Sequence, residues 1–218
     1  MTKDVSGRRI EGVLFDCDGV LVDSERVAIE CIVESAAEMG VIYDPEEAER
    51  QFTGARMANT VRDIEKRAGR AVPVGFEEDL RAKMARKFEG GLEPMAGAKA
   101  LIESLSLPFC VASNGPRAKM ELTLKVTGLI EYFKGRIVSA YEVGVWKPDP
   151  GLFLHAARHI GVEPERCAVV EDSDYGISAG VDAGMQVFAL VDAAKAGTLP
   201  EGVVAVRGLS ELHEIFSC

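Results

Sequence analysis

The sequence lacks any apolar run of the roughly 18 to 20 uninterrupted residues that a membrane-spanning helix needs. Its polar N-terminal segment, MTKDVSGRR, is not followed by the apolar stretch of a secretory signal. It also lacks a basic tract, and its formal net charge is −10. We therefore expect neither a membrane nor a nucleic acid as a partner, because the phosphate groups of both attract clusters of Lys and Arg.

Cysteine pairs at metal-binding or redox spacing are absent as well. The five cysteines are Cys17, Cys31, Cys110, Cys167 and Cys218, and no two of them form a CxxC pair. Three of the five lie in or beside segments that we expect to be buried strands. This distribution is typical of small buried side chains in a reducing compartment, so we expect no disulfides and a cytoplasmic location.

Short apolar segments rich in Val, Ile, Phe and Cys alternate with segments of helical periodicity over most of the chain. The apolar segments lack the every-second-residue pattern of half-exposed strands, so we expect them to be buried. The expected strands are 12–16, 109–113, 136–139, 167–171, 186–190 and 203–206, and the helices between them include 96–104, 117–127, 151–160 and 176–183. This alternation predicts the α/β class: a doubly wound, Rossmann-like parallel sheet with helices on both faces.

One region breaks the alternation, because no segment between residue 23 and about residue 91 has the composition of a strand. Four stretches there have helical spacing and end on glycine, namely 24–40, 45–54, 57–69 and 75–91. We predict a helical cap domain spanning 23–91, inserted into an α/β core made of 1–22 and 92–218. We expect the cap to open and close over the core, with hinges near 22–24 and 90–93.

Polar side chains follow the expected strands at the points where the strands end. In chain order they are Asp16, Asp18, Ser113, Asn114, Lys147, Glu171 and Asp172. Ligands bind beyond the carboxyl ends of the strands in an open parallel sheet, so we expect these side chains around one rim. Each group also has a simpler interpretation, as a turn, a helix cap or an exposed loop lysine. Their agreement across four separate segments favours a functional site.

The residue types at this rim indicate phosphoryl chemistry. Crowded carboxylates repel one another and need a cation, and an all-oxygen ligand set suits Mg²⁺ better than Zn²⁺. One carboxylate can attack phosphorus, while a second acid protonates the leaving oxygen and later deprotonates water. A serine hydroxyl and a lysine can hold the phosphoryl oxygens. We therefore expect a small phosphorylated metabolite as the partner.

The same residues carry a resemblance to a known family. The segments resemble, in order, the four motifs of the haloacid dehalogenase superfamily: Asp16-Cys17-Asp18-Gly19-Val20, Ser113-Asn114, Lys147-Pro148 and Glu171-Asp172-Ser173. The resemblance covers about residues 10 to 190, and the helical insertion is similar to the helical cap of that superfamily. By pattern the chain is most similar to the β-phosphoglucomutase-like phosphatase branch. Two departures are Val20, where many relatives have Thr, and a Glu-Asp pair in the fourth motif in place of Asp-Asp.

The resemblance implies a role for each acid. Asp16 would be the nucleophile and a Mg²⁺ ligand. Asp18 would be the general acid and base and would offer its backbone carbonyl to the metal. Asp172 would be a further ligand, and Glu171 would contact the metal directly or through water.

The remaining site residues are expected to bind the substrate. Ser113 and Lys147, which also count as catalytic residues, would hold the phosphoryl group. Asn114 would bind beside them, although its side chain could equally fix the turn. We expect a cis bond between Lys147 and Pro148, because an aimed lysine needs a rigid turn. In the cap, Arg56 is the expected contact for an anionic leaving group, and a plain surface arginine is the alternative.

These observations predict a Mg²⁺-dependent phosphatase that hydrolyses a small phosphate monoester, such as a sugar or sugar-acid phosphate, through an aspartyl-phosphate. A sugar phosphomutase on the same scaffold stays open as an alternative. A non-catalytic binding module of the same fold is a further alternative, and retention of Asp16, Asp18, Lys147 and Asp172 argues against it. The sequence indicates neither the leaving group nor an oligomeric state.

Overall fold

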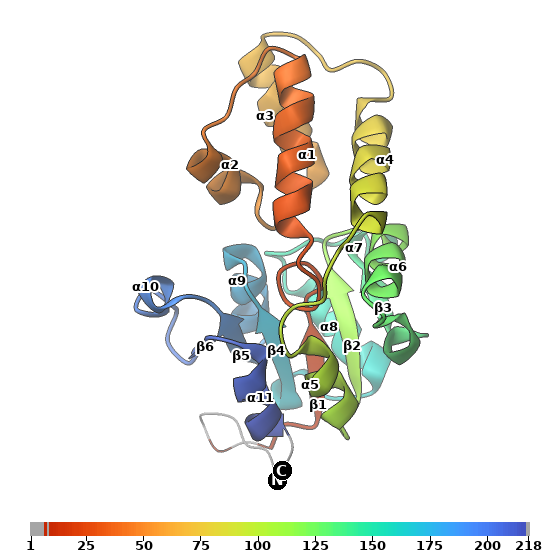
Figure 1. Ribbon diagram of the computed structural model, residues 1–218. Coiled ribbons are helices and arrows are strands. Elements are labelled where there is room, and N and C mark those ends of the chain that lie inside the picture. Colours follow the sequence, from red (N-terminus) through yellow and green to blue (C-terminus); the bar gives the residue numbers. More distant parts are fainter. Residues whose placement is uncertain (1–6, 8, 217–218) are drawn as a thin grey trace.

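The computed structural model describes residue 7 and residues 9–216. Its six strands form one parallel sheet in the order β3-β2-β1-β4-β5-β6 (Figure 1). The strands are β1 (Gly12–Phe15), β2 (Phe109–Ser113), β3 (Ile137–Ser139), β4 (Cys167–Glu171), β5 (Gln186–Leu190) and β6 (Val204–Val206). The strand order reverses between β1 and β4, which makes the sheet doubly wound. The predicted α/β class is confirmed.

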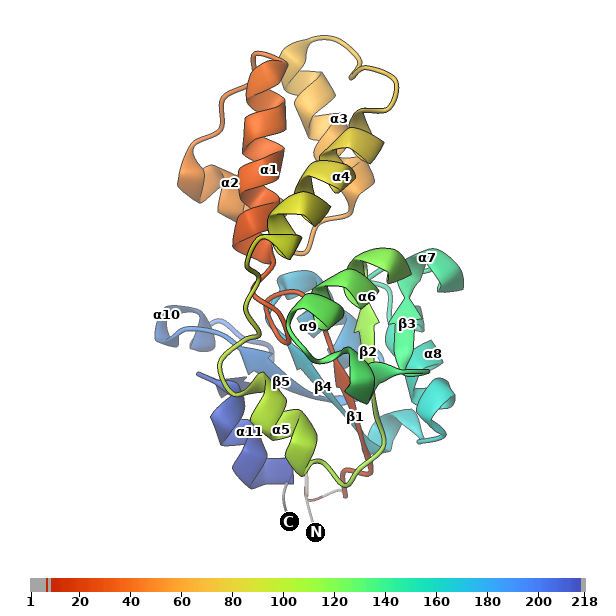
Figure 2. The same ribbon diagram turned by 45° about the vertical axis from the view of Figure 1, so that its right-hand side comes forward.

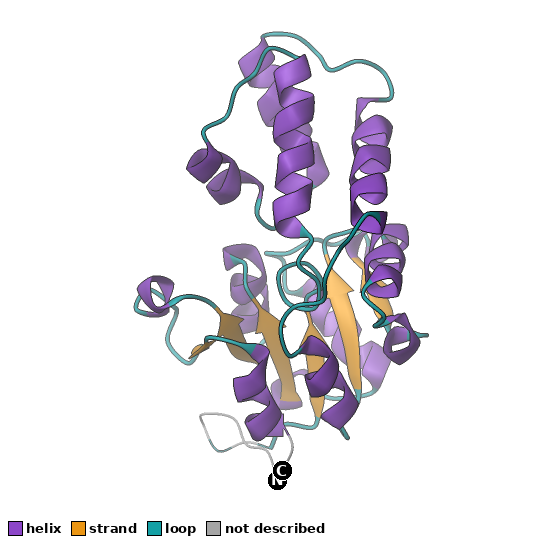
Figure 3. Ribbon diagram, in the orientation of Figure 1, coloured by secondary structure: helices purple, strands orange, loops and turns teal. Residues whose placement is uncertain are grey.

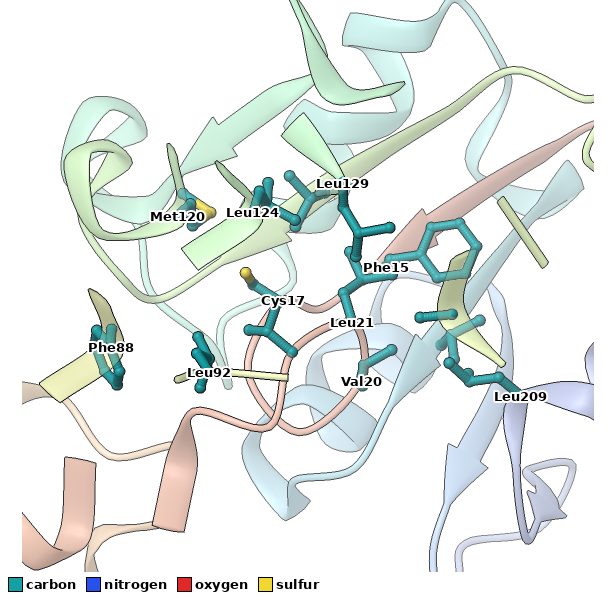
Figure 4. Packing of buried hydrophobic residues seen from close by; sticks show 14 of the residues in the cluster. Phe15, Cys17, Val20, Leu21, Phe88, Leu92, Met120, Leu124, Leu129 and Leu209 are labelled. Carbon is teal, nitrogen blue, oxygen red and sulfur yellow. The ribbon is translucent and has the colours of Figure 1, made fainter. Parts of the chain in front are cut away.

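Helices cover both faces of the sheet, because successive side chains of a strand point to opposite faces. On one face α5 (Ala98–Ser104), α6 (Arg117–Val126) and α11 (Leu209–Phe216) pack in the same cluster as Val13 and Phe15 of β1, part of which is drawn in Figure 4. On the other face α8 (Gly151–Ile160) and α9 (Asp174–Asp182) pack with Leu14. Burial on both sides explains why the strands lack an alternating pattern.

Four short helical segments complete the core. They are η1 (Ile130–Phe133), α7 (Ala140–Val143), η2 (Pro164–Arg166) and α10 (Ala193–Ala196). In the described part of the chain, no helix is both long and apolar enough to cross a bilayer. The four cysteines within that part are free thiols, and Cys218 lies outside the described residues.

A group of four helices stands over the carboxyl ends of the strands (Figures 1 and 2). They are α1 (Glu25–Glu38), α2 (Pro45–Phe52), α3 (Met57–Ala68) and α4 (Phe76–Glu89), and Figure 3 shows this part of the chain as helices and loops alone. Lys83 and Lys87 of α4 form ion pairs with Glu34 of α1, at 3.1 and 2.8 Å. The helices lie where the sequence predicts them; the division of the chain into domains at 22/23 and 91/92 stays a prediction.

The two segments that connect this helical part to the sheet run side by side. The backbone N–H of Asp23 donates to the carbonyl of Glu93 at 3.2 Å, and that of Met95 donates to the carbonyl of Leu21 at 3.0 Å. Leu21 and Leu92 are buried in the core cluster that also contains Phe88 (Figure 4). Both connections are thus anchored next to β1, directly beside the acids that follow this strand.

Candidate active site

The register of the sheet brings Asp16 and Glu171 to the same edge. Phe15 is paired with Val170 on the neighbouring β4, so Asp16, just after β1, and Glu171, the last residue of β4, lie at the same level of the sheet. The backbone N–H of Asp16 still donates to the carbonyl of Val170 at 3.0 Å. Two acids are therefore placed side by side before any side-chain contact is considered.

The ammonium group of Lys147 lies between these two acids. Its Nζ is 2.5 Å from Asp16 Oδ1 and 2.6 Å from Glu171 Oε1. The side chains of Lys147, Asp16 and Glu171 are 2%, 12% and 0% exposed, respectively, so water contributes little to their solvation. Burial raises the pKa of Asp16 to about 8 although Lys147 opposes this shift. Burial also acts to lower the pKa of Lys147, but the charges of the two acids raise it above its usual value.

The second oxygen of Glu171 is bonded to the turn that follows β4. Oε2 accepts hydrogen bonds from the backbone N–H of Asp172 at 3.0 Å and of Ser173 at 3.1 Å, and from the Ser173 hydroxyl at 3.0 Å. Gly176 of α9 makes this packing sterically feasible, because a Cβ there would lie 1.8 Å from the Glu171 carboxyl carbon. Both oxygens of Glu171 therefore have protein partners.

Asp18 is held by two residues outside the four motifs. Lys119 of α6 donates to Asp18 Oδ2 at 2.8 Å, and the hydroxyl of Ser24 donates to Oδ1. Burial acts to raise the pKa of Asp18, but these two partners lower it below the usual value. The sequence analysis did not single out Lys119 or Ser24, and their only signal is a position just after a motif.

Asp172 fits against a glycine of the first motif. A Cβ at Gly19, whose φ is +75°, would lie 1.9 Å from Asp172 Oδ2, so only glycine leaves room for this carboxylate. Burial, and after it the negative charge of Glu171, raises the pKa of Asp172 well above its usual value. Asp16 and Asp172 are thus buried acids whose charges the protein alone does not balance.

This imbalance tests whether the residues fit the Mg²⁺ that the family implies. The described His, Cys, Asp and Glu side chains do not form a group of three or more at metal-binding distances. However, buried carboxylates without sufficient counter-charge are the oxygen donors that a hard divalent cation prefers. The donor types and their excess negative charge therefore fit Mg²⁺.

Ser113 and Asn114 shape the turn after β2. Ser113 is 2% exposed, and its Oγ accepts a hydrogen bond from the backbone N–H of Gly115 at 3.1 Å. Asn114 Oδ1 accepts from the backbone N–H of Lys147 at 2.9 Å, and its Nδ2 donates to the Lys147 carbonyl at 3.3 Å. Asn114 thus fixes the backbone of Lys147. The Lys147–Pro148 peptide bond is cis, as expected. Lys147 does not follow β3 directly, because α7 lies between them in the chain.

A cavity lies above these residues and beneath the four helices. Its lining contains all seven rim residues, from Asp16 to Asp172, together with Lys119 and several residues of α1 and α4. Arg56, the expected substrate contact in the cap, is not in this lining; its guanidinium stacks on Trp146 at 3.9 Å from the ring centre. Arg81 of α4 lines the cavity instead.

Comparison with known proteins identifies the family. A model of the haloacid dehalogenase-like hydrolases matches residues 10–184. This chain belongs to that family. The hydrolase is 40% identical over 181 residues to 6-phosphogluconate phosphatase of Escherichia coli (strain K12), a match that covers 83% of this chain and 82% of that protein. The resemblance found in the sequence is confirmed.

Two solved structures show the same architecture. A hydrolase from Deinococcus radiodurans R1, with bound phosphate and sodium, has a TM-score of 0.75 and 30% identity, covering 95% of this chain and 98% of that one. A putative β-phosphoglucomutase from Thermotoga maritima has a TM-score of 0.73, with 94% and 98% covered. Its identity of 24% makes it evidence for the fold alone.

Proposed function

We propose that this hydrolase is a Mg²⁺-dependent phosphatase whose substrate is a small phosphate monoester, and that the substrate is a sugar-acid phosphate such as 6-phosphogluconate. The observation that carries the proposal is the buried Lys147 between Asp16 and Glu171, with Asp18 two residues from the proposed nucleophile. Sequence similarity to a 6-phosphogluconate phosphatase supports the substrate class. The free cysteines support a cytoplasmic location.

In the first step, a carboxylate oxygen of Asp16 attacks the phosphorus atom and the bond between phosphorus and the ester oxygen breaks. Lys147 and the Ser113 hydroxyl hold the phosphoryl oxygens on which negative charge develops. Asp18 must first take up a proton when the substrate binds, because Lys119 and Ser24 lower its pKa in the free protein, and it then gives this proton to the departing alcohol oxygen. The products are the free alcohol and an aspartyl-phosphate on Asp16.

In the second step, water attacks the same phosphorus atom. Asp18, now ionised, removes a proton from this water, and the bond between phosphorus and the Asp16 oxygen breaks. Inorganic phosphate leaves, and both acids return to their starting states. Glu171 anchors Lys147 and the turn after β4 in this proposal, and the protein contacts of both its oxygens favour contact with the metal through a water.

Bound Mg²⁺ would supply the positive charge that the buried acids lack. Asp16 and Asp172 would hold it with their side chains, and Asp18 with its backbone carbonyl. The carboxylates would then be ionised near neutral pH, which Asp16 needs in order to act as a nucleophile.

Phosphate release from a panel of monoesters tests the proposal. The panel contains 6-phosphogluconate, hexose phosphates, glycerol phosphates and nucleotides, each assayed with Mg²⁺ and with a chelator. We expect Mg²⁺-dependent release that is fastest from a sugar-acid phosphate. A folded protein that releases phosphate from no monoester would refute the phosphatase. Conversion of a sugar phosphate into its isomer without phosphate release would instead identify the phosphomutase.

A further inference from the structure

The cavity above Asp16 contains three basic side chains among its described lining residues. Lys147 and Lys119 are engaged by the acids below them, at distances of 2.8 Å or less. The third, Arg81, is the one that comes from the helices above the site. It is therefore placed where the leaving group, and not the phosphoryl group, would lie.

The contacts of Arg81 fix one part of its guanidinium and leave another free. Nε and Nη2 donate to Glu77 Oε1, one helical turn earlier, at 3.0 and 2.6 Å. Nη2 also donates to the hydroxyl of Tyr141 on α7 at 2.8 Å. Among the described residues, Nη1 has no hydrogen-bonding partner. An oriented guanidinium with free donors is suited to a carboxylate, which it binds with charge-assisted hydrogen bonds.

Apart from Glu25, Thr60 and Arg81, the side chains that the helical part contributes to the lining are apolar. They include Ala28, Ile29, Ile32, Phe52 and Met57. These side chains offer no partner for a charge on the leaving group. They also displace water from the cavity, which strengthens an ion pair formed beside them.

We propose that Arg81 binds a carboxylate on the leaving group and thereby selects sugar-acid phosphates over neutral sugar phosphates. The proposal rests on the proposed phosphatase function and adds the residue that sets its specificity. Tyr141 orients the guanidinium through its hydroxyl and carries no charge of its own. Arg56 does not compete for this role, because it stacks on Trp146 outside the cavity lining.

The test compares two open-chain substrates, 6-phosphogluconate and glucitol 6-phosphate. They differ only at the end remote from the phosphate, where one has a carboxylate and the other a hydroxymethyl group. A hydrogen bond between charged partners corresponds to a preference of about 10- to 150-fold. We expect the wild-type enzyme to prefer 6-phosphogluconate by such a factor in kcat/KM, mainly through a lower KM.

The variant Arg81→Met should lose this preference, because its kcat/KM should fall much further for 6-phosphogluconate than for glucitol 6-phosphate. Arg81→Lys should keep part of the preference, since it keeps the charge but not the planar fork. Tyr141→Phe should lower the preference for 6-phosphogluconate less than Arg81→Met does. Arg86→Met is the matched control: it removes an exposed arginine of the same helix, outside the lining, and should leave the preference unchanged.

Equal turnover of both substrates by the wild type would overturn the proposal. So would an Arg81→Met variant that loses activity on both substrates to the same extent. Calorimetric binding of D-gluconate separates this proposal from the phosphatase function. If the wild type hydrolyses no monoester but binds gluconate, and Arg81→Met does not, the phosphatase fails and the carboxylate site stands. If neither protein binds gluconate, the carboxylate site fails as well.

Discussion

The guanidinium of Arg56 lies 3.9 Å from the centre of the Trp146 ring, so the residue that directly precedes α3 stacks on a residue of the sheet-bearing core. Trp146 meets Tyr141 edge to face, with 5.5 Å between the ring centres, and Tyr141 accepts a hydrogen bond from Arg81. Two arginines from the helices above the site thus contact one aromatic pair just before Lys147. If the cap opens, these contacts must break.

Tryptophan fluorescence can report this contact, because Trp146 is the only tryptophan of the chain. We expect Arg56→Ala to expose the indole and to move its emission to longer wavelength. In the wild type, Mg²⁺ with inorganic phosphate should move emission to shorter wavelength, since a closed cap covers the ring. Arg62→Ala, an exposed arginine of the same helix, is the control and should leave the spectrum unchanged. Identical spectra for the wild type and Arg56→Ala would rule out Trp146 as a reporter of the cap.

Substitution of the proposed nucleophile separates catalysis from stability. We expect Asp16→Asn to lower kcat by about 10⁴-fold or more, because an amide cannot form the phosphoryl intermediate. The metal-free variant should be at least as stable as the wild type, because burial already raises the pKa of Asp16 to about 8 and favours its neutral form. Phosphate release and thermal unfolding measure the two effects, with the exposed Asp182→Asn as control. Substantial residual turnover would remove Asp16 from the nucleophile role.

The sheet could be predicted from the sequence because its strands are buried on both faces and read as continuous apolar runs. Each observed strand begins and ends within one residue of its expected bounds. The rim residues follow from the same logic, since an acid directly after a buried parallel strand must emerge at the carboxyl edge. The ends of the strands in the sequence therefore predict the positions of the side chains that directly follow them.

Side chains from helices and loops are harder to place. Lys119 reaches Asp18 only because α6 packs with one particular face against the sheet. Arg56 lies two residues after Gly54, whose N–H donates to Glu25 Oε1 at 2.9 Å and where an added Cβ would lie only 3.0 Å from the Cβ of Ser173. This contact fixes the loop on the core beside the cavity. Tertiary packing of this kind leaves no periodic signal in a single sequence.

Substitution of two lysines that form equally short ion pairs should have very different effects on the free energy of unfolding. Lys147–Glu171 and Lys134–Glu131 both measure 2.6 Å, but the first pair is buried and the second is about 70% exposed. We expect Lys147→Ala to lower the free energy of unfolding by about 3 to 5 kcal/mol, because it leaves the buried Glu171 without its counter-charge. Lys134→Ala should cost about 0 to 1 kcal/mol. Urea unfolding measures both, and a loss below about 1 kcal/mol for Lys147→Ala would contradict the argument.

The raised pKa values of Asp16 and Asp172 link stability to pH and to the metal. Asp16 keeps its proton in the metal-free fold up to a pKa of about 8, whereas the unfolded chain loses it near the ordinary value of 3.8. Between these values the folded state binds more protons than the unfolded state. The stability that Asp16 contributes is therefore present below the ordinary pKa and is lost as pH rises toward 8. The pKa of Asp172 is raised as well, so its contribution has the same sign.

Mg²⁺ should reverse this trend, because it binds the ionised carboxylates and competes with their protons. We expect the increase in Tm on adding Mg²⁺ to be larger at about pH 9 than at about pH 6, and binding at the lower pH to release protons. Thermal unfolding with Mg²⁺ or chelator, and calorimetry in buffers of different ionisation enthalpy, measure these two effects. In Asp16→Asn the proton release should fall, because the amide has no proton to yield. A Tm increase of the same size at both pH values would show that the metal does not compete with protons for the carboxylates of Asp16 and Asp172.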